Sequence, residues 1–219
     1  MNLVVFDLDG TLTQSRSIIS ENMRAALEFL PVPFVVISGA TEKQIREQVP
    51  IPDLVALGQS GNEYFGRQLA QEDKDKINAH IQEILDTDYI KAPDPEDLVE
   101  DRGSQISLSL MGHHADKQKK LEFDPDGSQR KKLLELHPFK EEDLQVFVAG
   151  TTCLDYVRKG WDKGSNIAAH AKKIGVDLDD VIYFGDQLYP GGNDESVKSI
   201  CRCIEVSSPD DTLTKLQQL

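Results

Sequence analysis

The stretch LVVFDLDGT, residues 3–11, decides the fold expected for this chain. Its apolar run at residues 3–6 predicts a strand buried on both faces, as in a parallel sheet. Asp7 and Asp9 follow the run, and because side chains alternate along a strand, both carboxylates should point to the same side. Adjacent buried carboxylates repel each other unless a cation lies between them or one is protonated. A plain turn at Gly10 would explain the glycine but not Asp7, so the pattern favours a functional strand end.

The flanking residues alternate between strand and helix. Ser20 is a suitable N-cap for an amphipathic helix, and Thr41 with Gln44 forms a capping box for a second one. Apolar runs predict further buried strands at residues 34–37 and 54–57, and the same rhythm resumes late in the chain. There we expect strands at 181–185 and 201–206, and helices at 163–175 (with Ser165 or Asn166 near its start), at 194–199 and from Ser208. This order predicts a doubly wound α/β core with a parallel sheet.

The middle of the chain has a different pattern. Residues 91–101, KAPDPEDLVED, predict a loop, and residues 106–112 alternate polar and apolar side chains, as in a half-exposed antiparallel strand. Further elements complete an expected α+β insert: helices at 71–86 and 127–136, and strands at 144–150 and 151–158. We therefore expect a core domain of residues 1–68 and 159–219, interrupted by an α+β cap domain of residues 69–158.

Composition and charge limit the classes of partner. The formal net charge of −14 argues against nucleic acid or an anionic membrane as the main partner, because no basic stripe can neutralise phosphates. No apolar run reaches the length of a membrane span, and because a strand is predicted from residue 3, we expect no signal peptide. Three cysteines, Cys153, Cys201 and Cys203, are too few for a disulfide framework. Cys201 and Cys203 are expected to be reduced thiols of a cytoplasmic protein, with a metal-binding pair as the alternative.

Two further segments place polar groups at the ends of predicted elements. Ser38 ends the strand at 34–37, and its hydroxyl, with the amides from Gly39 onward, can bind a phosphate oxygen. Ser-Gly after a strand is also a common turn. Lys163 precedes a helix, where its ammonium can meet a phosphate and a nucleophile together, and the alternative is a solvated loop lysine. Neither segment identifies an anion site by itself.

The stretch FGDQLYPGGND, residues 184–194, is the strongest signal after the first. A predicted buried strand ends in Asp186, and a glycine-rich loop leads from it to Asn193 and Asp194. Oxygen ligands of this kind suit Mg²⁺, which binds in proteins through one or two carboxylates plus substrate phosphate. Because the carboxyl ends of parallel strands meet at one edge of a sheet, these groups should lie near Asp7.

Four such motifs in this order resemble those of the haloacid dehalogenase superfamily, the phosphotransferases that use an aspartate nucleophile. The resemblance implies that Asp7 is the nucleophile and Asp9 the general acid and base, with Ser38 and Lys163 completing the catalytic set. It also implies a Mg²⁺ cofactor, held by Asp7, the backbone carbonyl of Asp9 and Asp186, and supported from further out by Asn193 and Asp194. The chemistry agrees with the spacing. A carboxylate that approaches a dianionic phosphate needs a cation, and a second carboxyl can protonate the leaving alkoxide.

Longer stretches resemble one branch of that superfamily, the eukaryotic-type phosphomannomutases. They are LVVFDLDGTLTQSR, GWDK, FGDQLYPGGND and, wholly or partly in the expected cap, EFDPDGSQRKKLLE and CLDYVRKGWDK. For each arginine concerned, a plain surface charge is the alternative. The candidate substrate contacts are Arg16, Gly39, Arg102, His113 and Asp155.

The cap departs from that resemblance at two positions. His113 stands where a phosphate-binding arginine would be expected, and Cys153 stands where the family has serine. Histidine is only partly charged near neutral pH and cannot form a bidentate fork with a phosphate. Arg102 or Arg130 would then have to compensate. The alternative for His113 and His114 is a plain surface position.

Together these patterns predict a Mg²⁺-dependent phosphohydrolase that acts on a phosphorylated sugar through an aspartyl-phosphate. The alternative is a phosphomannomutase that interconverts mannose 1-phosphate and mannose 6-phosphate. The likeness of the whole chain favours the mutase, and the missing cap arginine favours the hydrolase. We expect the site at the carboxyl ends of the core strands, roofed by the cap, with a small phosphorylated metabolite as partner and a homodimer through the cap. A signalling receiver lacks so large a cap, and an inactive binding module would not need four intact motifs.

Overall fold

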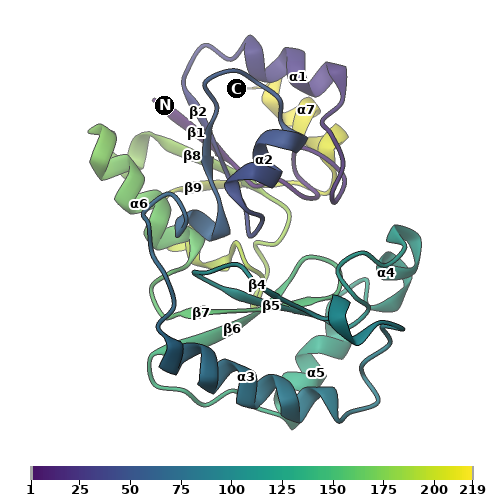
Figure 1. Cartoon of the computed structure of the whole chain (residues 1–219). Coiled ribbons are helices and arrows are strands. Elements are labelled where there is room, and N and C mark those ends of the chain that lie inside the picture. Colours follow the sequence, from purple (N-terminus) through teal and green to yellow (C-terminus); the bar gives the residue numbers. More distant parts are fainter. Residues whose placement is uncertain (1, 219) are drawn as a thin grey trace. The chain divides into compact units, whose positions relative to one another are not determined.

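The structure of the protein is a computed structural model, and it describes residues 2–218. Chain contacts divide it into two compact units (Figure 1). The first, the core unit, consists of two segments, one up to Gly66 and one from Trp161 onward. The second, the cap unit, is Arg67–Gly160 between them in the sequence. The division at residues 68 and 159 remains our proposal for the functional domains, and the contact-based limits fall close to it.

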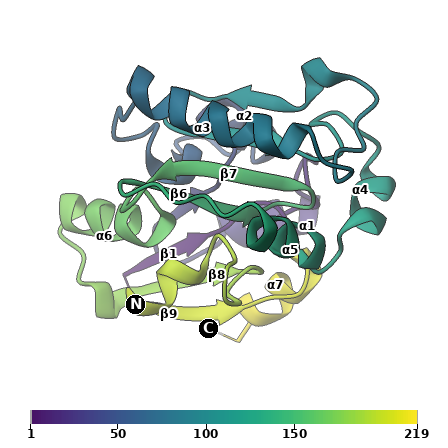
Figure 2. The ribbon, with the colours of Figure 1, turned by 90° about the horizontal axis from the view of Figure 1, so that it is seen from below.

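The core unit is built on a five-stranded parallel sheet in the order β3-β2-β1-β8-β9. Its strands are β1 (Leu3–Phe6), β2 (Phe34–Ile37), β3 (Val55–Leu57), β8 (Val181–Gly185) and β9 (Arg202–Glu205). Figure 2 shows β1, β8 and β9 side by side. In the central strand β1, Phe6 is in register with Val36 on one side and with Phe184 on the other. The chain winds outward from β1 in both directions, so the carboxyl ends of β1 and β8 form the switch point of the sheet.

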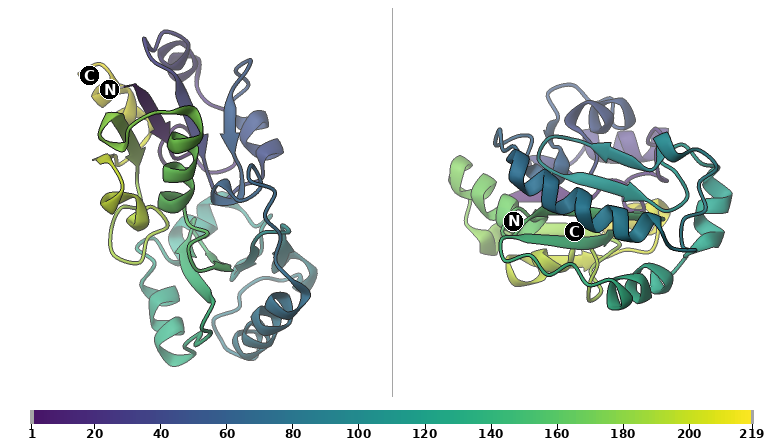
Figure 3. Two further views of the ribbon diagram at one scale, coloured as in Figure 1. Left: turned by 90° about the vertical axis from the view of Figure 1, so that its left-hand side faces the viewer. Right: turned by 60° about the horizontal axis from the view of Figure 1, so that its bottom comes forward.

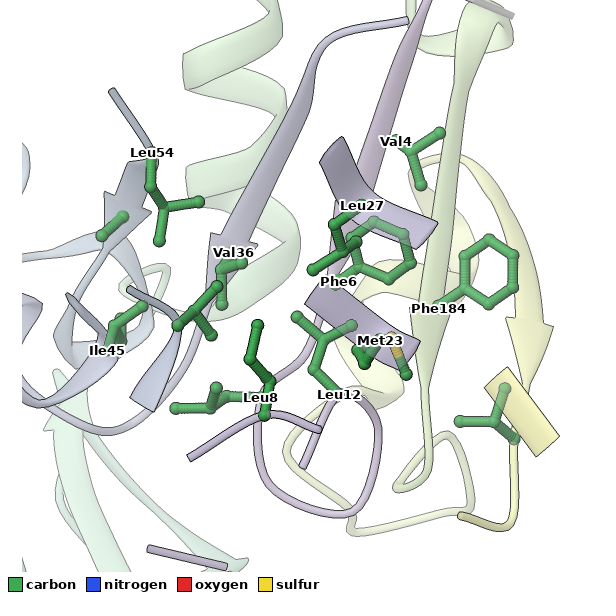
Figure 4. Close-up of a cluster of buried hydrophobic side chains, with 14 of the residues drawn as sticks. Val4, Phe6, Leu8, Leu12, Met23, Leu27, Val36, Ile45, Leu54 and Phe184 are labelled. Carbon is green, nitrogen blue, oxygen red and sulfur yellow. The ribbon is translucent and has the colours of Figure 1, made fainter. Parts of the chain in front are cut away.

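Alternate side chains of the strands fill two separate hydrophobic layers. On one face, Phe6 belongs to a cluster with Leu27 (Figure 4), to which helices α1 (Glu21–Glu28), α2 (Glu42–Gln48) and α7 (Pro209–Leu216) contribute. On the other face, Val5 packs in a cluster with Ile167 of α6 (Lys163–Ile174). Helices on both faces of a parallel sheet confirm the predicted doubly wound α/β class.

Local signals set the starts of the core helices. Ser20 and Thr41 cap α1 and α2 as predicted, Thr41 within a capping box. α6 begins at Lys163, the first residue of the predicted range 163–175, because Asp162 is its N-cap and accepts the Ser165 N–H at 2.8 Å. The cap at Asp162 therefore fixes Lys163 as the first residue of a helix.

The cap unit is an antiparallel sheet in the order β4-β5-β7-β6, with α3 and α5 on one face of it (Figures 1 and 3). Apolar residues such as Leu108 and Leu154 are buried, and the strand predicted as half-exposed is buried on both faces, because Ser107 and Ser109 are buried as well. This arrangement confirms the predicted α+β insert. The elements are α3 (Gln71–Leu85), β4 (Val99–Asp101), β5 (Ile106–Ser109), α4 (Lys117–Phe123), α5 (Ser128–Leu136), β6 (Leu144–Ala149) and β7 (Cys153–Arg158).

Two cap elements differ from the prediction. Residues 99–101, predicted as part of a loop, form β4, in which Val99 is paired with Leu108. The run is short and acidic, so its pairing with β5 decides its conformation rather than its own sequence. No pattern predicts α4, because KQKKLEF has no apolar stripe. Asp116 caps this helix and accepts the Lys119 N–H at 3.1 Å.

Short 3₁₀ turns join several elements. Within the part of the chain that the structure describes, they are Gln59–Gly61, Pro95–Asp97, Leu178–Asp180 and Glu195–Ser199. The last of them takes the place of the helix predicted at 194–199. Within the described residues, no helix combines the length and the apolar character needed to cross a membrane.

Candidate active site

The carboxyl ends of three neighbouring core strands carry polar side chains. Asp7 follows β1, Ser38 follows β2 and Asp186 follows β8. β1 lies between the other two strands, so all three residues leave the sheet at the same edge. The Asp7 N–H donates to the Phe184 carbonyl oxygen at 2.9 Å, which fixes the start of the loop beyond β1. The edge at which the winding direction changes is where α/β sheets bind ligands.

Three carboxyl groups and one ammonium group form a buried cluster at this edge. Asp7, Asp186 and Asp194 each offer a carboxylate oxygen, and these oxygens lie within 4.8 Å of one another. The Lys163 ammonium donates to Asp7 Oδ1 at 2.5 Å and to Asp194 Oδ1 at 2.6 Å. Lys163 is only 1% exposed, so these two carboxylates replace the water around its charge. With all carboxyls ionised, two negative charges of the cluster have no counter-charge within it.

Burial and mutual repulsion favour protons on the carboxyls of this cluster. Burial, together with the charges of Asp194 and Asp186, raises the pKa of Asp7 well above its usual value, although Lys163 opposes the shift. Burial and the Asp194 charge raise the pKa of Asp186 to about 7. Burial would lower the pKa of Lys163, but Asp194 and Asp7 outweigh it and raise that pKa, so the amine stays charged. The cluster therefore carries carboxyl groups that a further cation would keep ionised.

The residues at this edge fit a divalent cation. Asp186 Oδ1 and Asn193 Oδ1 are buried and have no hydrogen-bond partner in the part of the chain that the structure describes. Both are oxygen donors of the kind that Mg²⁺ selects. Gly10 has a φ of +88° and leaves room for Asp186, because a Cβ at Gly10 would lie 2.5 Å from Asp186 Oδ2. A doubly charged cation would also balance the two surplus negative charges.

Asp9 is placed differently from Asp7. Within the described residues, the acidic cluster does not include the Asp9 carboxylate. β1 ends at Phe6, so the strand alternation does not extend to Asp9, and the predicted common direction of the two carboxylates is not imposed by a strand. Asp9 Oδ1 instead accepts the N–H of Arg16 at 3.0 Å. Arg16 has an exposed side chain and a φ of +54°, an uncommon backbone conformation for a non-glycine residue.

Ser38 is buried in a turn. Its Oγ accepts the Ala40 N–H at 3.1 Å, across the half-buried Gly39. This bond closes a local turn, which the sequence allows as the alternative to a phosphate-binding role for Ser38 and Gly39. A hydroxyl oxygen that accepts a hydrogen bond still has its own hydrogen to donate, so the turn is compatible with phosphate binding.

Two contacts of Asp194 escape sequence reasoning. The Tyr183 hydroxyl donates to Asp194 Oδ1 at 2.6 Å, and the Gln187 N–H donates to Asp194 Oδ2 at 3.1 Å. Asp194, expected only as outer support for a metal, thus contacts Lys163 directly. The available signal was the tyrosine itself, since a hydroxyl inside the buried strand VIYFG needs a partner.

The cap candidates Arg102 and Asp155 lie on one face of the cap sheet. Glu100, Ser107 and Asp155 form a row across β4, β5 and β7. The Ser107 hydroxyl donates to Asp155 Oδ1 at 2.5 Å, and the Arg102 guanidinium donates to Glu100 Oε2 at 2.6 and 2.9 Å. Both candidates therefore have partners within the cap unit.

His113 belongs to the same group of side chains. It is 1% exposed, so the plain surface position given as its alternative is wrong, whereas His114 is exposed. His113 Nε2 lies 3.2 Å from the Ser107 carbonyl oxygen, and Nδ1 lies 3.6 Å from Glu100 Oε2. Burial opposes the charged imidazole, but a hydrogen bond with Cys153 and the charge of Glu100 raise the pKa of His113 overall.

The guanidinium of Arg130 is not available to replace the phosphate-binding arginine that the cap lacks at position 113. Its Nε donates to Asp124 Oδ2 at 2.7 Å, and its Nη1 donates to the carbonyl oxygens of Ala149, Gly150 and Cys153 at 2.7, 3.1 and 3.1 Å. The guanidinium therefore ties α5 to the turn between β6 and β7 and has a structural role.

Solved structures of other proteins have a fold similar to that of this chain. An IMP-nucleotidase from Plasmodium falciparum superposes with a TM-score of 0.69 at 14% identity, covering 100% of this chain and 68% of that one. A haloacid dehalogenase-like hydrolase from Bacteroides thetaiotaomicron gives a TM-score of 0.57 at 15% identity, covering 99% and 98%. Identities this low show the fold alone. The fold and the acidic strand ends together define a haloacid dehalogenase-like protein with an inserted cap.

Sequence relatives narrow this class. The family model of eukaryotic phosphomannomutase matches residues 60–219. A probable phosphomannomutase of Caenorhabditis elegans is 30% identical over 96% of this chain and 92% of that protein. A phosphomannomutase of Encephalitozoon cuniculi is 30% identical over 99% and 92%. The chain belongs to the eukaryotic phosphomannomutase family. It is an enzyme, a phosphotransferase of the haloacid dehalogenase superfamily, and the predicted resemblance is confirmed.

Proposed function

We propose that the protein is a Mg²⁺-dependent phosphomannomutase, which interconverts mannose 1-phosphate and mannose 6-phosphate through an aspartyl-phosphate on Asp7. The observation that carries this proposal is that likeness to phosphomannomutases extends over the cap as well as the core, at 30% identity over 96% of the chain. The prediction of a phosphohydrolase depended on one cap position, His113. We give more weight to the similarity to phosphomannomutases along the whole chain than to this single residue.

The surroundings of His113 also weaken the argument against transfer. The raised pKa of His113 increases its charged fraction near neutral pH, so it can act as a cation toward a phosphate. We propose that His113 and Arg102 bind the phosphate that is not reacting, and that Asp155 and Arg16 contact the sugar phosphate. A cationic histidine still lacks the bidentate fork of arginine, so its grip on the phosphate is weaker.

The core residues have complementary roles in this proposal. One Asp7 oxygen attacks the phosphorus, the bond from phosphorus to the sugar oxygen breaks, and Asp9 gives that oxygen a proton. In the preceding half-reaction, Asp9 takes a proton from the free hydroxyl of the sugar monophosphate, whose oxygen attacks the phosphoenzyme and releases Asp7, so that a sugar bisphosphate forms and one of its two phosphates is not reacting. Lys163 orients Asp7 and offsets charge, and Ser38 with the Gly39 amide binds phosphoryl oxygens.

We propose that Mg²⁺ is held by Asp7, Asp186 and the backbone carbonyl of Asp9, with Asn193 and Asp194 in support. When bound, the ion would offset the repulsion between the Asp7 carboxylate and a dianionic phosphate. Calorimetry tests this assignment, since Asp186→Asn should abolish measurable Mg²⁺ binding.

One experiment tests the main proposal. The protein is incubated with mannose 1-phosphate and Mg²⁺, with and without a hexose bisphosphate activator, and both products are followed. The mutase predicts that mannose 6-phosphate forms faster than inorganic phosphate and that the activator increases its rate. Inorganic phosphate as the first and main product would contradict the mutase.

A phosphohydrolase of sugar phosphates is the second candidate. It is favoured by the histidine at position 113 and by the pairing of Arg102 with Glu100. The variant His113→Arg separates the two candidates. If the grip of the cap limits transfer, His113→Arg should raise the ratio of transfer to hydrolysis by about tenfold, the effect of one stronger charged contact. An unchanged ratio would show that position 113 does not decide the reaction.

We also propose a homodimer through the cap unit and a cytoplasmic location. Leu121 of α4 and Leu136 of α5 are exposed apolar side chains on that unit. Light scattering should give twice the chain mass, and Leu136→Asp should lower it. The free thiols of Cys153, Cys201 and Cys203 suit a reducing compartment, which cell fractionation tests.

A further inference from the structure

Tyr183 is a buried residue to which the proposed mechanism gives no role. Its side chain is fully buried in β8, and its hydroxyl donates to Asp194 Oδ1 at 2.6 Å. The same oxygen accepts the Lys163 ammonium at 2.6 Å, and the other oxygen of Asp194 accepts the Gln187 N–H at 3.1 Å. Asp194 is itself fully buried, so these donors replace the water that would otherwise stabilise its charge.

The fold holds the Tyr183 hydroxyl in place. The ring belongs to the hydrophobic cluster that contains Val5 and Ile167, so packing in this cluster holds its position. Gly185 leaves the space in which the ring and the carboxylate meet. A Cβ at Gly185 would lie 2.5 Å from Asp194 Oδ2 and 2.6 Å from Tyr183 Cε1. The contact between Tyr183 and Asp194 is therefore built into the strand end.

Lys163 is shared between two acceptors. One is Asp7, the proposed nucleophile, at 2.5 Å, and the other is Asp194. A buried carboxylate with few donors attracts a neighbouring ammonium strongly, whereas each added donor reduces that demand. The Tyr183 hydroxyl supplies such a donor on the Asp194 oxygen that Lys163 also contacts. Without it, Lys163 would be drawn toward Asp194 and away from Asp7.

We infer that Tyr183 is a positioning residue, which acts through Asp194 to keep the Lys163 ammonium directed at Asp7. The inference rests on the proposed function only in taking Asp7 as the nucleophile. It holds for a mutase and for a hydrolase alike. Because Tyr183 touches no reacting atom, it affects the rate of phosphoryl transfer and leaves substrate binding alone.

The variant Tyr183→Phe removes the hydroxyl and keeps the ring. With Mg²⁺ and 4-nitrophenyl phosphate, we expect kcat to fall by about tenfold while KM stays within about twofold. Tyr156→Phe is the matched control, since Tyr156 is also fully buried and its hydroxyl lies within hydrogen-bond distance of His80 Nδ1, at 2.9 Å, in the cap unit. The control should lose similar stability in a thermal melt and keep its kcat.

A second comparison tests the route through Asp194. In an Asp194→Asn background, Tyr183→Phe should have no further effect beyond about twofold, because the two residues act in series. A readout other than turnover is the binding of beryllium fluoride, a phosphoryl analogue, followed by ¹⁹F NMR. Tyr183→Phe should weaken this binding, and Tyr156→Phe should not.

The outcomes separate this inference from the proposed function. A wild-type protein without turnover and without beryllium fluoride binding would contradict the proposed function and, with it, the role of Tyr183. An active wild type whose kcat is unchanged in Tyr183→Phe would contradict the inference alone. An equal loss in Tyr156→Phe, a full tenfold loss in the Asp194→Asn background, or a Tyr183→Phe protein that does not fold would each overturn it too.

Discussion

Lys163 in the core unit and Arg130 in the cap unit are both buried cations, 1% and 2% exposed, but the charges around them differ. Arg130 has one carboxylate partner, Asp124, and gives its remaining bonds to backbone carbonyls. Lys163 has two carboxylate partners, and the third carboxyl of the cluster, Asp186, has a buried oxygen without a partner among the described residues. A balanced buried ion pair needs no further partner, whereas surplus charge with unpaired acceptors indicates that a ligand completes the site.

The two sites also differ in how the chain assembles them. Asp124 and Arg130 are six residues apart, so a single turn and helix start bring them together. Lys163 is separated from Asp7 by 156 residues and from Asp194 by 31. Only the completed sheet can join these three. The structural pair is therefore local in sequence, and the candidate active site depends on the whole core.

The largest effect is expected from Asp7→Asn. Loss of the proposed nucleophile should lower turnover of an aryl phosphate by about 10⁴-fold or more. Thermal unfolding without Mg²⁺ should occur at the same temperature or higher, because the variant removes one surplus buried charge. An active Asp7→Asn protein, within about a hundredfold of wild type, would show that the charge surplus does not mark the nucleophile.

Asp9→Asn should have the next largest effect. Removal of a general acid and base typically costs about 10²–10⁴-fold in rate. Because its carboxylate is outside the acidic cluster, Mg²⁺ affinity measured by calorimetry should change little, in contrast to Asp186→Asn. If both variants lose Mg²⁺ binding equally, Asp9 belongs to the metal site through its side chain and its proposed role is wrong.

Arg130→Met tests whether the buried pair of Arg130 and Asp124 has a structural role only. The variant leaves Asp124 buried without its partner, so the free energy of unfolding in urea should fall by about 3–5 kcal/mol. Activity of the folded protein at low temperature should be unchanged. Adding Asp124→Asn should recover part of the lost stability, since the unpaired charge is then removed. A lower kcat in folded Arg130→Met would mean that this cation serves the site after all.

A smaller effect is expected from pH. The pKa of Asp186 is raised by burial and by Asp194 to about 7, from an ordinary 3.8. Between these values the native state binds more protons at Asp186 than the unfolded state does, so Asp186 contributes a fall in the stability of the metal-free protein as pH rises from about 4 to 7. Carboxyls whose pKa is lowered, such as Asp97 and Asp101, contribute the opposite slope, so the measurement compares wild type with Asp186→Asn. Asp186→Asn should remove the fall that Asp186 contributes. If the stability of the metal-free wild type and of metal-free Asp186→Asn changed with pH by the same slope, the raised pKa of Asp186 would be contradicted.

Bound Mg²⁺ should also stabilise the folded protein. At pH 8, Mg²⁺ at about 100 times its Kd should raise the free energy of unfolding by about 2.7 kcal/mol, and this stabilisation should be smaller at pH 5.

The parts of the fold that the sequence predicts are those with a strong local pattern. The buried run at 3–6 and the capping box at Thr41 each allow one interpretation, and both are confirmed. The alternation at 106–112 predicts the strand β5 but not the burial of both its faces. The sequence does not predict β4 and α4, because their residues have no such pattern. β4 forms through its pairing with β5, and α4 begins at its N-cap Asp116. The candidate site follows the same rule. Its strand-end acids are visible in sequence, but the contact of Tyr183 with Asp194 joins positions that no local pattern relates.

The sequence by itself indicated the superfamily through the resemblance of its motifs. It also predicted the parallel core, the insert and the positions of Asp7, Asp186 and Lys163 at element ends, because periodicity and terminal polar residues are local properties of the chain. Only the tertiary structure decided which of these groups touch and which cations are already balanced. It showed that Lys163 is shared by two carboxylates, that Arg130 is committed to Asp124, and that His113 is buried beside Glu100. The reason is physical: the charge state of a buried group depends on the neighbours that the fold brings to it and on the water that it removes.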